Sequence, residues 1–159
     1  MATIQQTAQA LWPQFAGHSE IKSLLEKDGR TGVVVKAELF HRPKGERPFA
    51  VGVLSDEKEL KYRQFALEKY VRLYHRPEHR TSTESRNETA QLYSGAVRGT
   101  TYIVSTSGLW PDALDELFSV ALLVAIDDLW LEAAVKILQR AKNPYARAIS
   151  TMKLHGLVS

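Results

Sequence analysis

The sequence predicts an α+β fold in which an antiparallel sheet is backed by helices. Residues 33–40 and 49–54 are two runs of β-branched and aromatic residues joined by a short polar loop, which favours a hairpin. A third run, from Gly99 to Ser107, ends in a Ser-Gly turn and leads directly into an apolar helix. The chain has 159 residues, the length of one domain. We therefore treat residues 1–159 as a single domain.

Two helices are expected before the first strand. One covers residues 3–15 and is interrupted near Pro13, because proline removes a helical hydrogen bond. The next begins at Ser19, a favourable N-cap residue, and ends at Gly29, which suits a left-handed position after a helix. The loop HRPKGER, residues 41–47, joins the two strands that follow and is too polar to be buried.

The hairpin is followed by a helix capped at Ser55-Asp56, with Asp56 and Glu59 at the spacing of a capping box. Its aromatic and aliphatic residues recur at the three-and-four spacing of one helix face. These residues are Tyr62, Phe65, Ala66, Tyr70, Leu73 and Tyr74. A helix that follows a hairpin usually packs back across it. We expect this face, Phe65 included, to be buried against the sheet.

Pro77 ends this helix, and residues 79–91 after it are polar with few apolar anchors. Such a composition offers little burial to offset the conformational entropy that ordering costs. We expect residues 81–88 to form the most mobile loop of the chain.

An apolar helix starts at Asp112, directly after a proline. It either runs on to residue 141 or bends near Asp127, where two adjacent carboxylates interrupt the apolar run. A last helix is expected over residues 144–156. Residues 130–159 would then form a helical, basic C-terminal extension.

The composition excludes several classes of protein. Cysteine is absent, which rules out thiolate catalysis, disulfides and cysteine-bound zinc. The N-terminus has no Lys or Arg ahead of an apolar run, which argues against a secretory signal. The longest apolar run, residues 120–126, is far shorter than the roughly 20 residues that span a bilayer. We expect a cytoplasmic protein with no membrane partner.

Charge is distributed unevenly along the second half of the chain. Only acidic charges lie between Arg98 and Lys136, and only basic charges follow Glu132. An acidic face of one subunit could contact the basic tail of another, which predicts a homo-oligomer, or the tail could bind its own domain. The alternative is that these charges cover ordinary solvated helix faces.

Three motifs in a fixed order resemble a known family. The segment KYVRLYHRP at residues 69–77 follows a strand that reads PFAVGVL, and YIVSTSGLWPDALDEL comes later in the chain. Together they resemble the HbpS/GlcG-like haem-binding family, which includes the C-terminal domain of PduO-type proteins, over about residues 33–127. The resemblance implies a profilin-like fold, symmetric oligomers and the binding of haem or a related tetrapyrrole. The chain departs from the family in its shorter SGAVRG hairpin at residues 94–99, and in carrying Asp115-Glu116 where the family commonly has Asp-His.

The helix end before Pro77 is the expected ligand site. There Tyr74 offers an aromatic wall, His75 an axial donor for haem iron, and Arg76 a cation that can pair with a propionate. The alternative interpretation is that His75 is a surface residue at a helix end. His75 and His79 are four residues apart, but the intervening proline breaks the helical geometry that a metal-binding pair would need.

Other functions fit the sequence less well. Basic residues interleaved with tyrosines between Lys58 and Arg86 are typical of a nucleic-acid surface, but the tyrosines fall on the helix face expected to be buried. Ser105 and Ser107 lack the Gly-x-Ser-x-Gly pattern of a hydrolase nucleophile, and no catalytic residue is assigned. The sequence therefore predicts an oligomeric module that binds or senses a small ligand, with haem as the candidate cofactor. The alternative is a ligand-free assembly protein that uses its apolar helix face and basic C-terminal tail to hold a protein partner.

Overall fold

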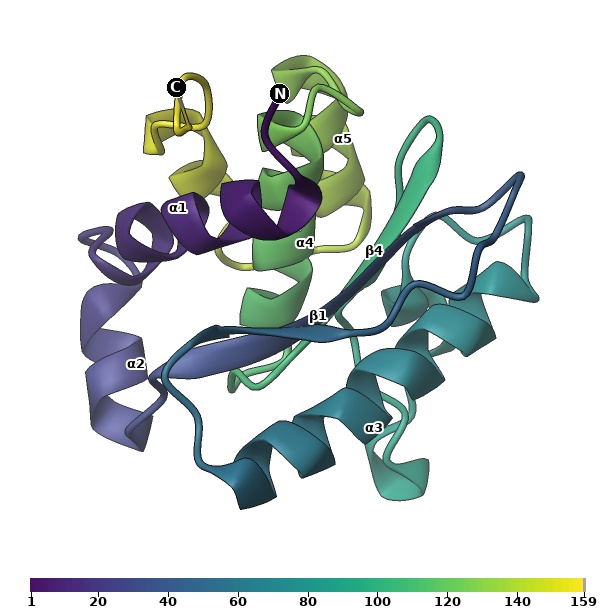
Figure 1. Ribbon diagram of the computed structural model, residues 1–159, viewed down its shortest axis with the longest axis horizontal. Coiled ribbons are helices and arrows are strands. Elements are labelled where there is room, and N and C mark those ends of the chain that lie inside the picture. The colour runs from purple at the N-terminus through teal and green to yellow at the C-terminus, as the bar shows by residue number, and fades with distance from the viewer. Residues whose placement is uncertain (159) are drawn as a thin grey trace.

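Four antiparallel strands form one sheet in the order β2-β1-β4-β3 in the computed structural model, which describes residues 1–158 (Figure 1). The elements in chain order are α1 (Ile4–Ala16), α2 (Lys22–Asp28), β1 (Gly32–Leu39), β2 (Phe49–Gly52), α3 (Asp56–Tyr74), η1 (Ser82–Ser85), η2 (Glu88–Ala90), β3 (Ala96–Arg98), β4 (Tyr102–Ser107), α4 (Ala113–Ala125), α5 (Leu131–Arg140) and η3 (Ala146–Thr151), where η marks a 3₁₀ helix.

The helices cover both faces of the sheet (Figure 1). The helix α3 packs on one face against β1, β3 and β4, and α1 and α4 pack on the other. The elements α5 and η3 lie behind α4. This arrangement confirms the predicted α+β fold with an antiparallel sheet backed by helices. Among residues 1–158, no helix is both long and apolar enough to cross a membrane.

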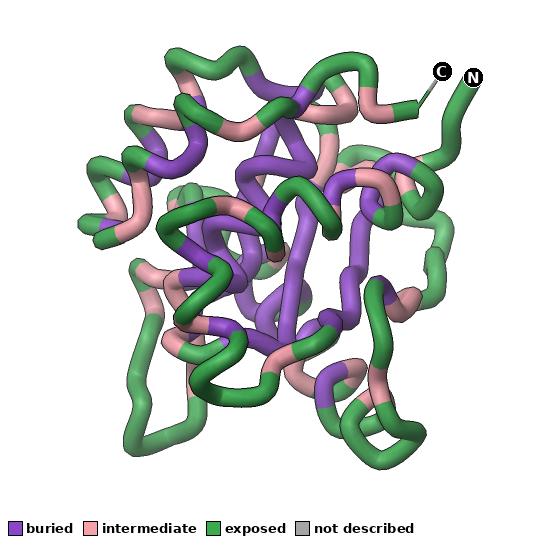
Figure 2. Tube along the Cα trace, turned by 90° about the vertical axis from the view of Figure 1, so that its left-hand side faces the viewer, coloured by how far each residue is buried: buried purple, intermediate pink, exposed green. Residues whose placement is uncertain are grey.

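The strand β1, one of the two inner strands of the sheet, is buried on both of its faces. Buried segments run through the centre of the domain in Figure 2. Val33 and Val35 belong to the main hydrophobic core with α1 and α4. The side chains that alternate with Val33 and Val35 along the strand lie on the other face of the sheet, toward α3. On that face Lys36 lies 5.1 Å from the centre of the Tyr70 ring. The sheet therefore has one apolar face and one face that carries buried charges.

The start of the chain follows the prediction with two corrections. The helix α1 continues through Pro13 without interruption. The N-cap of α2 is Ile21, because Ser19 lies within a turn in which the Ile21 N–H donates to the carbonyl of His18 at 2.9 Å. Ile21 is completely buried, so its insertion into the core determines where α2 begins.

The helix α3 buries charged residues that the sequence analysis placed outside its apolar face. Tyr70 and Leu73 are buried as predicted, but Phe65 is only half-buried, so its predicted burial against the sheet is wrong. Lys69 and Arg72 are buried instead. The cap also differs, because the Ser55 hydroxyl accepts the Lys58 N–H at 3.2 Å and, in the part of the chain that the structure describes, no capping box involves Asp56.

The segment after α3 is anchored at its start, where Thr81 and Ser82 are buried, whereas residues 86–88 are exposed, so the mobility expected of residues 81–88 stays a prediction. Ser82 is completely buried, and the Arg72 guanidinium donates to the carbonyls of Ser82 and Ser85 at 3.0 and 3.1 Å and to the carbonyl of Tyr93 at 2.6 Å. Hydrogen bonds to a charged group are worth about 1.5–3 kcal/mol each. The anchors of this segment are therefore polar, and a search for apolar residues misses them.

The chain bends after α4, which was one of the two predicted alternatives. The bend is fixed by Asp128, whose carboxylate accepts the backbone N–H groups of Thr101 and Tyr102 at 2.9 to 3.1 Å. Residues 144–156 contain the short 3₁₀ helix η3 rather than an α-helix. Leu138 and other apolar residues of α5 and η3 belong to the main core, so the end of the chain packs as part of the domain.

Candidate functional site

A cavity with aromatic walls and buried ionisable side chains lies between α3 and the turn that follows β4. Its volume is about 210 Å³. Its walls are formed by Tyr62, Phe65, Tyr93 and Trp110, and its charged residues are Arg30, Lys61, Lys69, Asp112 and Asp115. We call this the aromatic cavity. A concave apolar site with a few convergent polar groups is the usual form of a small-molecule site.

Edge-to-face contacts connect the aromatic walls. The rings of Phe65 and Tyr93 are 5.7 Å apart at 61°, and those of Tyr93 and Trp110 are 5.9 Å apart at 88°. Phe65 is half-buried because it faces this cavity and not the sheet. Such pairs stabilise one another by about 0.5–1.5 kcal/mol beyond the area they bury. Phe65, Tyr93 and Trp110 therefore form a connected aromatic surface contributed by three separate segments.

A buried ion pair forms one side of the aromatic cavity. The Lys69 ammonium donates to the Asp115 carboxylate at 2.9 Å and to the Thr106 carbonyl at 2.8 Å. The other Asp115 oxygen accepts the Leu109 N–H at 3.0 Å. Burial raises the pKa of Asp115 to about 6, although the attraction of Lys69 and its hydrogen bond oppose the shift. A strongly shifted carboxyl group in a cavity is a common mark of a functional site.

Asp112 borders the same cavity but is held in its charged form. Burial alone would raise the pKa of Asp112, but hydrogen bonds from the Arg86 guanidinium and the Ser94 N–H lower it below its usual value. Arg86 binds the carboxylate through two nitrogens at 2.8 and 3.1 Å. The pKa values of the two aspartates of the cavity are therefore shifted in opposite directions. Each aspartate already has a cationic partner.

Arg30 brings a cation with spare donor capacity to the opposite wall. Its Nη1 donates to the Tyr62 hydroxyl at 2.9 Å and to the Gly108 carbonyl at 3.3 Å. Its Nε is buried and has no hydrogen-bond partner among residues 1–158. A buried donor without a partner costs about 1–3 kcal/mol. A ligand that supplies an acceptor would remove this cost.

Two glycines allow the backbone to approach the buried pair and the aromatic wall. Gly95 has φ +141°, and a Cβ atom there would lie 2.4 Å from the Thr106 carbonyl oxygen and 2.7 Å from the Lys69 nitrogen. Gly108 has φ +136°, and a Cβ atom there would lie 3.1 Å from a ring carbon of Tyr62. Side chains at either position would displace the residues that shape the cavity.

The residues predicted to bind a ligand lie together at the end of α3, outside the aromatic cavity. The Tyr74 ring stacks on Tyr70 at 6.1 Å, and the His75 ring meets Tyr74 edge-on at 5.2 Å. His75 and Arg76 are exposed. The three residues therefore form an accessible surface at the helix end, and their role as ligand-binding residues stays a prediction. Among the described residues, no three His, Asp or Glu side chains are grouped as metal ligands would be.

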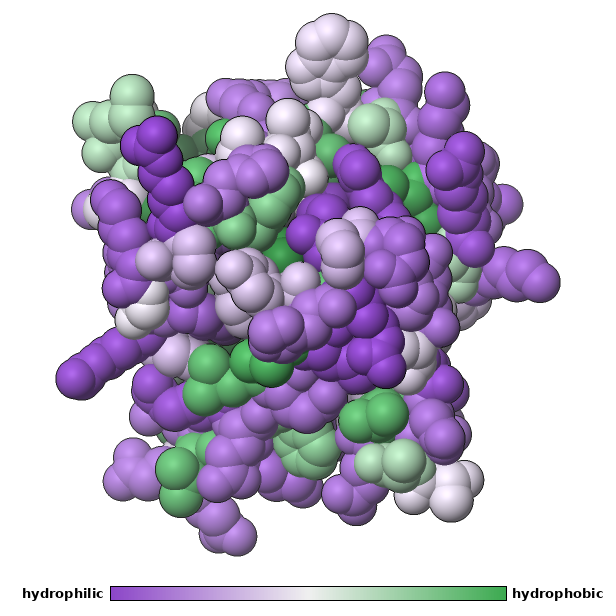
Figure 3. Space-filling view, turned by 90° about the vertical axis from the view of Figure 1, so that its right-hand side faces the viewer, coloured by the Kyte–Doolittle hydropathy of each residue, from purple (hydrophilic) through white to green (hydrophobic). Residues whose placement is uncertain are grey.

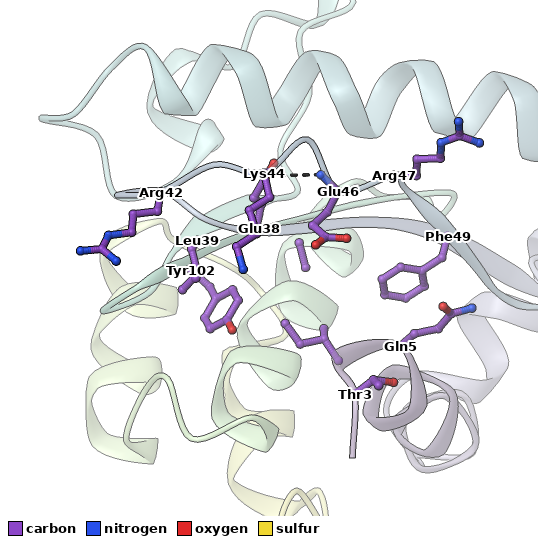
Figure 4. A pocket seen from close by; sticks show the side chains of 12 residues that line it. Thr3, Gln5, Glu38, Leu39, Arg42, Lys44, Glu46, Arg47, Phe49 and Tyr102 are labelled. Atoms are coloured by element: carbon purple, nitrogen blue, oxygen red, sulfur yellow. Dashed lines mark hydrogen bonds between the residues drawn. The ribbon is translucent and has the colours of Figure 1, made fainter. Parts of the chain in front are cut away.

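A second cavity, of about 410 Å³, lies below the loop that joins β1 to β2 (Figure 4). The Glu38 carboxylate holds this loop by accepting the backbone N–H groups of Lys44, Gly45 and Glu46, the last at 3.2 Å. Burial would raise the pKa of Glu38, but the hydrogen bonds from Lys36 and the loop backbone lower it. Glu38 thus already has its full set of partners, and we assign it the role of anchoring the loop.

The sequence analysis missed the aromatic cavity. Lys69 follows Tyr62 by seven residues and Ala66 by three, so it lies on the buried face of α3, and this spacing was the available signal. Nothing in the sequence indicated that Tyr93 and Trp110 would meet beside it, because that contact depends on how residues 77–95 pack.

Comparison with known proteins adds no family to this description: the chain matches no protein-family model, and no curated protein or solved structure is significantly similar to it.

Proposed function

We propose that the protein is a small-ligand-binding module whose aromatic cavity takes a planar, anionic organic molecule. The observation that carries the proposal is the position of the buried Lys69–Asp115 pair at a cavity walled by aromatic rings. Aromatic walls select flat ligands, and convergent polar groups fix their orientation.

The charges of the aromatic cavity favour an anion. Both aspartates have cationic partners, Lys69 and Arg86, at 2.8 to 2.9 Å. Arg30 and Lys61 have no carboxylate within 4.0 Å among residues 1–158, so their charges remain available. Arg30 is the stronger candidate because a guanidinium can bind a carboxylate through two hydrogen bonds.

The volume limits the size of the ligand. Cavities that enclose drug-sized molecules have volumes of about 300–1,000 Å³. The aromatic cavity, at about 210 Å³, suits a single aromatic ring with one acidic substituent. It is too small to enclose a tetrapyrrole.

Calorimetric titration with benzoate and with benzylamine tests the proposal, because the two probes share a ring and differ in charge. We expect benzoate to bind and benzylamine not to bind. Lys61→Gln should weaken benzoate about threefold, as expected for an exposed charge, and Arg30→Gln about tenfold. Lys58→Gln is the matched control, because Lys58 is an exposed lysine on the same helix that does not line the cavity.

Two results would defeat the proposal. One is equal affinity for benzoate and benzylamine, which would show that the cations play no part. The other is an equal effect of Lys61→Gln and Lys58→Gln, which would assign any binding to the general charge of α3. Thermal unfolding of each variant separates loss of binding from loss of the fold.

Tetrapyrrole binding is the second candidate, and it rests on the exposed His75 beside the ring of Tyr74. The resemblance to the HbpS/GlcG-like family supports it. A haem here would lie against the outer surface at the end of α3, with Arg76 available to a propionate. A hemin titration followed by absorbance, with His75→Ala as the variant, tests this candidate separately from the benzoate experiment.

Assembly as a homo-oligomer in the cytoplasm is part of this proposal. The apolar residues of α4 from Leu114 to Val124 are buried in the core, so this helix face is not available to a partner. Trp130 is 80% exposed at the start of α5 and is the residue through which the C-terminal helices could make such a contact. The face seen in Figure 3 is mainly hydrophilic, with its apolar side chains in separate spots. Sedimentation of the wild type and Trp130→Ser would show whether that residue joins subunits.

A further inference from the structure

A cavity of about 480 Å³ lies between the segment that follows α3, the end of β3 and the outer face of α5. Four basic side chains line it: Arg80, Arg98, Lys136 and Arg140. We call it the basic cavity. It shares no lining residue with the aromatic cavity. Its cations come from segments far apart in the sequence, so the fold itself gathers them.

None of these four cations has an acidic partner among the described residues, and three of them are also not held by backbone carbonyls. Within residues 1–158, no carboxylate lies within 4.0 Å of the side-chain nitrogens of Arg80, Lys136 or Arg140. Two carboxylates also line the cavity: that of Glu84 accepts the backbone N–H of Arg80 at 2.6 Å, and that of Glu78 lies 3.8 Å from the Nε2 atom of His79. Lys136 and Arg140 are one helical turn apart on α5, which places them on the same side of the cavity.

Arg98 fixes the shape of the basic cavity from within. Its guanidinium donates to the carbonyl of Leu73 at 2.7 Å and to the carbonyl of His79 at 3.2 Å, which holds the chain after α3 in place. Burial lowers the pKa of Arg98 and the nearby charge of Arg80 lowers it further, while the charge of Glu78 acts in the opposite direction. The Nδ1 atom of His79, another lining residue, is buried without a hydrogen-bond partner among the described residues. An anion would relieve the repulsion between the arginines.

We propose that the basic cavity binds the phosphate groups of a small phosphorylated molecule. Arginine and lysine side chains that converge from two sides suit an anion with several oxygens and more than one negative charge. The volume of about 480 Å³ lies in the range of small-molecule sites. This inference does not depend on the aromatic cavity or on tetrapyrrole binding.

Inorganic triphosphate is the probe, titrated by calorimetry at low ionic strength into the full chain. The test variant is Lys136→Gln with Arg140→Gln, which removes two exposed cations without an ion pair. We expect it to weaken triphosphate binding by about tenfold or more. The matched control is Arg42→Gln with Lys153→Gln, which removes one arginine and one lysine that are exposed, lie outside the cavity and have no ion pair among residues 1–158.

Equal affinities of the two double variants would overturn the proposal, because binding would then depend on net charge alone. Citrate that binds as tightly as triphosphate would overturn the assignment to phosphate. A single-stranded oligonucleotide could also bind more tightly than triphosphate, with both double variants weakening its binding equally. That result would replace the small molecule with a nucleic-acid backbone as the ligand. The proposal would also be overturned if the wild-type protein did not bind triphosphate at millimolar concentration.

Discussion

Replacement of Lys69 by methionine tests the buried ion pair of the aromatic cavity. Methionine keeps most of the side-chain volume but removes the charge, so Asp115 is left buried without its cation. Breaking a buried ion pair in this way costs about 3–5 kcal/mol. We expect a loss of this size in the free energy of unfolding, measured by urea denaturation at pH 8.

The loss should depend on pH, and its sign follows from the pKa of Asp115. In the wild type this pKa is raised to about 6, so the folded protein holds the Asp115 proton more tightly than the unfolded chain does. Protonation of Asp115 therefore stabilises the fold below the ordinary pKa of an aspartate, and this contribution is lost as the pH rises through about 6. Lys69→Met removes the attraction that opposes the shift and raises the pKa further. The destabilisation should therefore be smaller at pH 5 than at pH 8.

The double variant Lys69→Met with Asp115→Asn completes the cycle. The asparagine oxygen can still accept the Leu109 N–H, and neither charge of the pair remains. We expect the double variant to recover most of the stability, because replacing a buried ion pair with two neutral residues often changes the free energy of unfolding little. Losses that simply add, or a single-variant loss under about 1 kcal/mol at both pH values, would refute the reasoning.

Three further outcomes follow from the structure. Phe65→Ala should lower the free energy of unfolding by about 2 kcal/mol, less than for a fully buried ring, because Phe65 is half-buried; a loss of about 4 kcal/mol in urea denaturation would place it in the core. Arg72→Met should expose the segment that it anchors, so trypsin should cleave after Arg86 faster than in the wild type; unchanged digestion would show that Arg72 is not the anchor. His75→Ala should weaken hemin binding or shift its Soret band and His155→Ala should not; equal spectra for both variants would remove His75 from the site.

The order of the helices and of β1, β2 and β4 was predictable because it follows from local pattern, whereas the three-residue strand β3 was not predicted. The spacing of apolar residues on α3 and the β-branched runs of the strands each carry their own periodicity. Boundaries set by tertiary contacts were not predictable in the same way. Ser19 is a good N-cap residue, but the insertion of Ile21 into the core starts α2 later.

The candidate site was less predictable than the fold because it depends on long-range polar contacts. Lys69 and Asp115 are 46 residues apart, and a charged residue is normally placed on a solvated face. The packing of residues 77–95 through Arg72 and Arg86 brings Tyr93 to the aromatic cavity. Polar anchors of this kind leave no periodic signal in a single sequence.

Nuclear magnetic resonance of the three tryptophan indole N–H groups during a benzoate titration shows whether the aromatic cavity takes a planar anion. Trp110 lines the cavity, whereas Trp12 packs in the core beside Phe118 and Trp130 is exposed at the start of α5. We predict a saturable shift of the Trp110 resonance, with the other two unchanged, and no shift with benzylamine. Equal shifts of all three resonances, or none at saturating benzoate, would contradict the account.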